Sequence, residues 1–176
     1  MSSRRCHNAI QLLHVNDIQV EGVQNICDAA YCHFSAHYKA VNMDRPGVEN
    51  LQFNRLTMAE SGNLIRPFTM DEVRKAVWDC DSFKSPGPDG ISFGFIKQFW
   101  SELKDDFMRF VFEFQWNGRL TKGVNATFIA LIPKVNSPQR LNDFRPISLV
   151  GCLYKVLANI LANRLRDVIG SVISDS

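Results

Sequence analysis

Two basic side chains, Lys134 and Arg145, stand beside short apolar segments of the sequence. Lys134 follows the run Phe128–Ile132, whose β-branched and aromatic members are typical of a buried strand. A polar turn at Asn136–Gln139 lets the chain return through Phe144–Leu149, so the two segments predict a hairpin. The point charge of a lysine and the planar fork of an arginine together suit a polyphosphate. A hairpin edge with two solvated cations is the alternative that this spacing leaves open.

The motif SPGPDGI at Ser85–Ile91 places two glycines shortly after Lys84. Backbone amides at glycines can approach an anion closely, which would make this segment a phosphate-binding loop. The motif lacks the Gly-Lys-Ser/Thr of a nucleotide P-loop, however, and its prolines remove N–H donors. A rigid turn between two helices is an equally good interpretation of the same residues.

Two further groups have residue types that bind metals. Cys27, Cys32, His33 and His37 lie close in sequence, but no zincin-type glutamate separates the histidines and the cysteines are too far apart for a common zinc pair. The adjacent carboxylates Asp105–Asp106 are expected on a solvated helix face, outside the strand or hairpin setting of a two-metal site. We therefore predict no catalytic residue and no metal ligand in this chain.

The elements that must position these residues are mostly helical. In chain order we expect a hairpin or frayed lead-in at 9–20, a helix at 20–41, an irregular link at 47–66, a helix from 69 to the SPGPDG turn, one or two helices at 91–116 broken near 100, the basic hairpin, and a helix from about 153 to 169. Thr69 and Glu72 form a capping box, and Phe68 can staple onto Val73. Asn117-Gly118 is a C-cap signal.

The periodicity also predicts which side chains face inward. These are Val23, Ile26, Cys27, Ala30, Tyr31, Phe34, Tyr38 and Val41 in the first helix, and Phe95, Phe99, Leu103, Phe107, Phe110 and Phe114 in the 91–116 segment. In the last helix, Lys155, Arg164 and Arg166 are expected to lie off the apolar face.

Bulk properties limit the class of protein. The 176 residues are 45% hydrophobic, enough for one domain with a buried core, and the net charge of +2 does not by itself indicate a nucleic-acid-binding protein. Between positions 122 and 166, however, a single acidic residue, Asp143, accompanies Lys122, Lys134, Arg140, Arg145, Lys155, Arg164 and Arg166. Five scattered cysteines form no disulfide framework, and no stretch has membrane-spanning length, so we expect an intracellular protein without membrane contact.

Three blocks in this order resemble a known family: SPGPDGI, then IPK at Ile132–Lys134 with FRPISL at Phe144–Leu149, then LYKVLANILANRL from Leu153. They are similar to the fingers region of reverse transcriptases from non-LTR retrotransposons, especially the plant-type long interspersed elements. The resemblance implies an α+β, helix-rich part of a right-hand polymerase, with short antiparallel strands in the fingers and the edge of the palm. It divides the chain into a helical linker at 1–66 and a truncated reverse transcriptase domain at 67–176.

The resemblance also implies roles for individual residues. Lys134 and Arg145 match the cations that bind the triphosphate of the incoming nucleotide. The residues expected to lie along the template strand are Lys84, Pro86, Gly87, Pro88, Asp89, Gly90, Pro146 and Ile147. Mg²⁺ is expected for the full-length enzyme but not bound by this chain, because the family's metal-binding aspartates come further along the sequence. An RNA template and a DNA primer are the implied partners, and the nucleus is the implied location. Because the fingers helices of this family pack partly on palm elements that come later in the sequence, the resemblance also implies that apolar faces at 107–114 and 153–169 remain partly exposed, with marginal stability or self-association as the result.

Three hypotheses follow. The first is a fragment of an RNA-directed DNA polymerase that contacts template and nucleotide but is inactive alone, because the catalytic aspartates are missing. The second is a non-catalytic nucleic-acid-binding module, which salt-sensitive and sequence-tolerant binding would support. The third is a helical protein-interaction relic with no affinity for nucleic acid.

Overall fold

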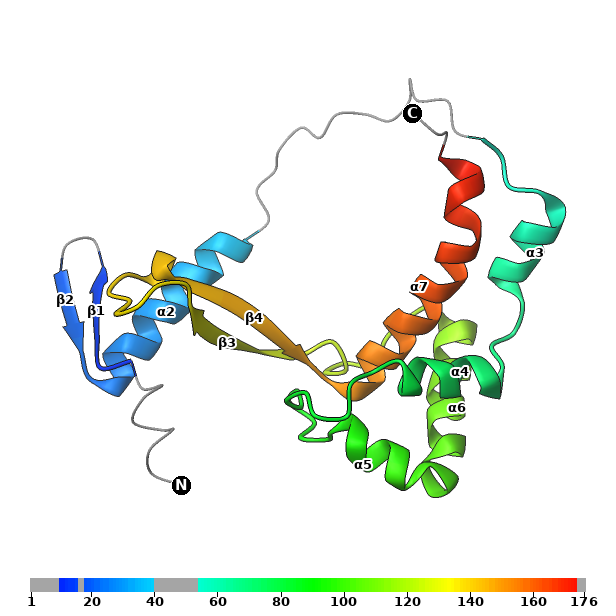
Figure 1. The fold of residues 1–176 in the computed structure, drawn as a ribbon, viewed down its shortest axis with the longest axis horizontal. Coiled ribbons are helices and arrows are strands. Elements are labelled where there is room, and N and C mark those ends of the chain that lie inside the picture. The colour runs from blue at the N-terminus through cyan, green and yellow to red at the C-terminus, as the bar shows by residue number, and fades with distance from the viewer. Residues whose placement is uncertain (1–9, 16–17, 40–53, 174–176) are drawn as a thin grey trace. The chain divides into compact units, whose positions relative to one another are not determined.

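The computed structural model describes residues 10–15, 18–39 and 54–173 (Figure 1). Its elements are β1 (Leu12–Val15), β2 (Ile18–Glu21), α2 (Val23–Tyr38), α3 (Met58–Ile65), α4 (Met70–Trp78), α5 (Phe93–Gln98), α6 (Trp100–Asn117), β3 (Thr127–Pro133), the 3₁₀ turn η1 (Leu141–Asp143), β4 (Phe144–Val150) and α7 (Cys152–Val172). Helices and two separate two-stranded sheets, β1-β2 and β3-β4, confirm the α+β class. The chain forms two compact units, one from 1–47 with 130–147 and one from 48–129 with 148–176.

The first unit has a small core beneath a hairpin. β1 and β2 pair antiparallel with Leu13 opposite Val20, which confirms the hairpin alternative for 9–20. The buried core residues are Leu13, Ile26, Phe34, Leu141 and Phe144. Helix α2 lies inside the predicted 20–41 range, but its buried face is narrower than predicted. Val23, Cys27, Tyr31 and Tyr38 are exposed, and the buried residues of the helix are Ile26 and Phe34. Val41, also predicted to face inward, lies outside the described residues.

The second unit is built around α4, which packs against α5, α6 and α7. Its capping box is confirmed: the Thr69 N–H donates to Glu72 Oε2 at 2.9 Å, and the Glu72 N–H donates to Thr69 Oγ1 at 3.3 Å. Phe68 is buried in the same cluster as Val73, as the staple predicts. The cluster contains Phe68, Val73, Ala76, Val77, Phe93, Ile96, Phe107, Val111, Cys152, Val156 and Ile160.

Helix α3 lies in the segment that the sequence predicts to be irregular, so that prediction is wrong. A second capping box starts it, with the Glu60 N–H donating to Thr57 Oγ1 at 3.2 Å and the Thr57 N–H donating to Glu60 Oε2 at 2.8 Å. The sequence therefore contains the Thr-x-x-Glu signal of a helix N-terminus at Thr57 and Glu60. No residue of α3 is buried, which explains why periodicity gave no sign of a helix.

The predicted break in the 91–116 segment falls at Phe99, whose backbone leaves the helical region between α5 and α6. Phe95 and Phe99 do not face inward as predicted, since they are 48% and 41% exposed. The buried residues of α5 are instead Phe93 and Ile96, because the break changes the phase of the apolar face between the two helices. Gly118 ends α6 with a φ of 63°, which confirms the C-cap.

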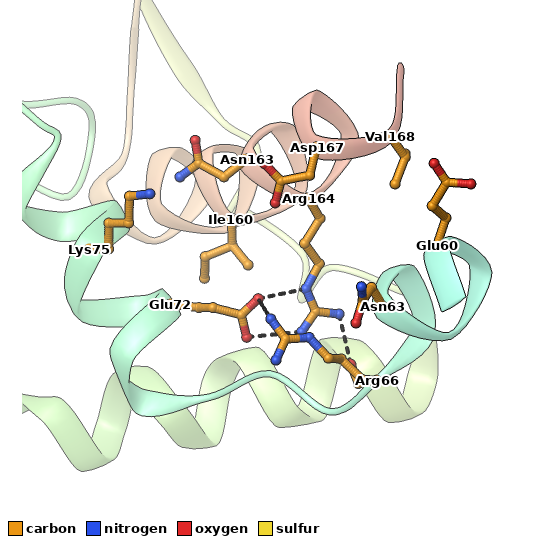
Figure 2. A pocket seen from close by; sticks show the side chains of 10 residues that line it. All are labelled: Glu60, Asn63, Arg66, Glu72, Lys75, Ile160, Asn163, Arg164, Asp167 and Val168. Atoms are coloured by element: carbon orange, nitrogen blue, oxygen red, sulfur yellow. Dashed lines mark hydrogen bonds and ion pairs between the residues drawn. The ribbon is translucent and has the colours of Figure 1, made fainter. Parts of the chain in front are cut away.

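Arg164 departs most from the sequence-based expectation. It is 7% exposed and lies on the buried stripe of α7, four residues from both Ile160 and Val168. All five of its N–H donors are used: Nε and one Nη donate to the Glu72 carboxylate at 2.8 and 3.0 Å, and the others donate to the carbonyls of Leu64, Arg66 and Pro67. Figure 2 shows the bonds to Glu72 and Arg66. The guanidinium also lies 4.1 Å from the centroid of the Phe68 ring.

This arginine joins three helices. Its carbonyl partners are at the C-terminal end of α3 and in the link to α4, its carboxylate partner is in the first turn of α4, and its own backbone is in α7. The Arg164 hydrogen bonds, with those from Thr69, hold the pKa of Glu72 down at about 2. Glu72 therefore stays ionised, and its ion pair with Arg164 stays intact, at every pH well above 2.

We expect Arg164→Met to destabilise the protein by about 3–5 kcal/mol, because it leaves Glu72 and three carbonyls without their partner. Arg166→Met is the matched control, since Arg166 is exposed and donates only to Asn163. Urea denaturation followed by circular dichroism measures both. Equal, small effects of the two substitutions would contradict the structural role of Arg164.

Acid should weaken the same contact. Because the pKa of Glu72 is about 2 in the folded state and 4.5 ordinarily, its contribution is complete above about pH 4.5 and is lost as the pH falls toward 2. Glu72→Gln should lower the free energy of unfolding by about 3 kcal/mol at pH 7, and the difference from the native chain should shrink between pH 5 and 2. Urea midpoints at several pH values test this, and a difference independent of pH would contradict it.

Candidate nucleic-acid interface

The SPGPDG loop turns the chain between α4 and α5, and its first glycine lies against the start of α7. Gly87 is buried, and a Cβ there would lie 2.4 Å from the carbonyl carbon of Val150 and 2.6 Å from the nitrogen of Gly151. No side chain larger than hydrogen fits such a contact between two backbones. Gly90 closes the turn by donating its N–H to the Gly87 carbonyl at 3.0 Å.

Asp89 caps α7 from outside the helix. The N-cap residue, Gly151, has no side chain to accept a hydrogen bond, and Asp89 Oδ2 accepts one from the Cys152 N–H at 2.5 Å instead. A carboxylate at a helix N-terminus is also favoured by the helix dipole. Burial, and then the Asp89 carboxylate, raise the pKa of the Cys152 thiol to about 12, so this cysteine stays protonated in the core.

The remaining residues of the loop point a different way. Lys84, Pro86, Pro88 and Gly90 are exposed. Pro88 also lines, with Lys122 and the start of α7, an open cavity of about 340 Å³. Gly87 and Asp89 are therefore accounted for by docking of the loop, while Lys84 and the prolines are the members that a nucleic acid could reach.

The second candidate region is the loop end of the β3-β4 hairpin. Lys134 and Arg145 are both exposed, Pro146 is half-buried, and Ile147 is 44% exposed. The strand at β3 is confirmed, but it is not buried as predicted: Phe128 is 57% exposed, because the strand belongs to a sheet of only two strands.

Hydrogen bonds fix the loop that connects these strands. The Lys134 ammonium donates to the Asn142 carbonyl at 2.9 Å, and the Asp143 carboxylate accepts from the backbone N–H groups of Gln139 and Arg140 at 3.0 and 2.9 Å. The backbone bonds, first that from Arg140, hold the pKa of Asp143 below its ordinary value. The loop end is thus ordered around an ionised carboxylate.

A backbone hydrogen bond closes the hairpin beside Lys134. The Lys134 N–H donates to the Asp143 carbonyl at 2.7 Å, which makes positions 134 and 143 partners across the hairpin. Asp143 belongs to the 3₁₀ turn η1, so this bond joins the end of β3 to the turn that precedes β4. Lys134 follows β3 and Arg145 lies near the start of β4, so both exposed cations are at the same end of the hairpin.

Other ionisable groups form no reaction centre in the part of the chain that the structure describes. Asp105 and Asp106 are exposed on α6, and Asp106 pairs with Arg109 at 2.6 Å. No three His, Cys, Asp or Glu residues among those described, His33 and His37 on α2 included, are close enough to hold a metal ion. No helix among the described residues is long and apolar enough to cross a membrane.

A cavity of about 370 Å³ lies between α3, α4 and α7 (Figure 2). Its lining mixes both signs of charge: Glu60, Arg66, Glu72, Lys75, Arg164 and Asp167. Arg164 has no donor left for a ligand, because the protein uses all five. The cavity is explained by the packing of the three helices. The prediction that Arg164 lies off the apolar face is wrong, although its spacing of eight and four residues from Val156 and Ile160 is the signal of a buried position.

Gly87→Ala should destabilise the second unit by about 2 kcal/mol or more, because its methyl group would overlap the Val150 carbonyl. Gly62→Ala is the control: no atom lies within 4 Å of its Cβ position, and an alanine in α3 should stabilise by about 0.5–1 kcal/mol. Thermal melts of both variants test the pair. Effects of the same sign would contradict the docking of the loop.

No protein-family model matches the chain. A stretch of 107 residues, 61% of the chain, is 34% identical to the Transposon TX1 uncharacterized 149 kDa protein of Xenopus laevis. A stretch of 85 residues, 48% of the chain, is 35% identical to the Retrovirus-related Pol polyprotein from type-2 retrotransposable element R2DM of Drosophila melanogaster. The matched stretch spans 8% of the length of each relative. The chain is therefore related in sequence to proteins of transposable elements, one of them a Pol polyprotein.

Proposed function

We propose that this chain is the fingers part of the RNA-directed DNA polymerase of a non-LTR retrotransposon, of the plant-type group. The observation that carries the proposal is its 35% identity to a retrotransposon Pol polyprotein over 85 residues. The order of the motifs SPGPDGI, IPK and FRPISL supports the same assignment. In this role the chain holds an RNA template and the triphosphate of an incoming nucleotide, in the nucleus.

Two features of the structure support the proposed contacts. Lys134 and Arg145 are exposed at the loop end of the hairpin, where a lysine point charge and an arginine fork are available to phosphate oxygens. Lys84 is exposed on a loop whose backbone is fixed by Gly87 and Asp89. Charge presented by an ordered framework stabilises a phosphoryl-transfer transition state without reorganisation.

The proposed role is positioning, since the described carboxylates do not suit a pair of Mg²⁺ ions. Asp105 and Asp106 project from a helix into solvent, and Asp106 is already paired with Arg109. Two-metal sites need carboxylates held together so that two ions sit about 4 Å apart. We expect no templated DNA synthesis by this chain alone.

A protein-contact role is the second candidate, and one surface favours it. An apolar hollow of about 850 Å³ on α6 is lined by Pro67, Met108, Phe112 and Trp116, and the Trp116 side chain is 91% exposed. Leu165 and Ile169 on α7 are also half exposed. Exposed aromatic and aliphatic groups of this size favour self-association or a protein partner.

Binding to a primed RNA template as a function of salt concentration tests the proposal. The native chain should bind with an affinity that falls steeply with salt, because phosphate contacts release counterions. Lys134→Ala/Arg145→Ala should weaken binding and lower the slope of log affinity against log salt by about two. Lys75→Ala/Arg109→Ala removes the same charge from exposed positions on α4 and α6, and should change neither.

Two results would overturn parts of the proposal. If the native chain shows no affinity for nucleic acid at low salt, the protein-contact role becomes the better account. If primer extension occurs with magnesium and nucleotides in the same samples, the chain has catalytic carboxylates that we have not identified.

A further inference from the structure

The Phe83 side chain is 97% exposed, the highest value among the large hydrophobic residues of the described chain. It immediately precedes Lys84 at the start of the SPGPDG loop. The ring packs into neither apolar cluster of the described residues.

The backbone beneath Phe83 is held on both sides. The Phe83 N–H donates to Asp81 Oδ1 at 2.9 Å, and the Lys97 ammonium donates to the Trp78 and Cys80 carbonyls at 3.2 and 2.6 Å, which fixes the chain as it leaves α4. On the far side, Gly87 is packed against the start of α7. The ring is therefore held out into water by an ordered turn.

An exposed aromatic ring beside a lysine suits one ligand chemistry well. Proteins that bind single-stranded nucleic acids stack bases on aromatic side chains while cations follow the phosphates. We propose that the Phe83 ring stacks on an unpaired base of a nucleic-acid strand whose phosphate contacts the adjacent Lys84. The inference rests on the proposed function and adds to it a base contact that is independent of the hairpin cations.

The surroundings of Phe83 favour a nucleic-acid strand over a protein partner. Lys84, Ser85 and Pro86 are exposed next to Phe83 in the sequence, and the next large apolar side chains, Trp78 and Ile91, are only 42% and 38% exposed. The buried centre of a protein interface needs several apolar anchors close together. A single ring flanked by a cation and polar groups can satisfy a base and its phosphate.

Fluorescence anisotropy with a labelled single-stranded RNA and an abasic strand of the same length tests this. Phe83→Ala and Phe83→Leu should each bind the RNA roughly ten-fold more weakly, and Phe83→Trp should bind it as the native chain does, because stacking needs an aromatic face. The salt dependence should be unchanged in these variants, whereas Lys84→Ala should reduce its slope by about one. Binding of the abasic strand should not respond to changes at Phe83.

Trp116→Ala is the matched control, since it removes an aromatic ring that is 91% exposed on α6, and its binding should equal that of the native chain. Native affinity in Phe83→Leu, or an equal loss on the abasic strand, would overturn the stacking contact. Binding that depends on Lys134 and Arg145 but not on Phe83 would overturn this inference and leave the proposed function standing. Absence of any binding by the native chain would overturn both.

Discussion

The guanidinium of Arg164 lies almost out of water, and it stays charged there because each of its five N–H groups has an acceptor. Removing a charge from water costs several kcal/mol, so the arrangement is favourable only when all the acceptors are in place together. Those acceptors come from the end of α3, the link at 64–67 and the first turn of α4. None of these segments can shift alone without leaving the charge unpaired. The second unit is thus expected to form as one cooperative structure.

The opposite end of α7 is held by a different polar contact. Asp89 accepts from the first N–H of the helix, and Gly87 brings the loop backbone against Val150. Between these two contacts Cys152, Val156 and Ile160 of α7 pack into the apolar cluster that includes Val73, Ala76 and Val77 of α4. The helix therefore supports the outward residues of the SPGPDG loop, and the direction in which Lys84 and Phe83 face depends on it. Because Arg164 is buried and its charge is paired with Glu72, the positive field of the C-terminal third is smaller than its sequence suggests.

Sequence reasoning succeeded where the signal was local. The Thr69–Glu72 capping box, the Gly118 C-cap and the break at Phe99 each follow from neighbouring residues, and each was predicted. It failed where distant segments decide the outcome. Arg164 can occupy the buried stripe only because Glu72 and three carbonyls accept its hydrogen bonds. An arginine judged by residue type alone is expected on the surface. The β3 strand has the composition of a buried strand but only β4 as a neighbour in its sheet. Helix α3 was not predicted because it has no buried face and so no apolar periodicity, although its capping box is present in the sequence.

Within the SPGPDG motif, two kinds of residue must be weighed differently as evidence of function. Gly87 and Asp89 are required for the loop to dock on α7, so any chain with this packing needs them whether or not it binds a template. Their match to the reverse transcriptase pattern therefore supports the fold more than the activity. Lys84 and Arg145 make no side-chain hydrogen bond within the described residues, and the packing gives no reason for a cation at either place. A side chain whose type the fold does not require is the better indicator of a ligand. For that reason the case for nucleic-acid binding depends on the exposed cations and Phe83, and the loop glycines add little to it.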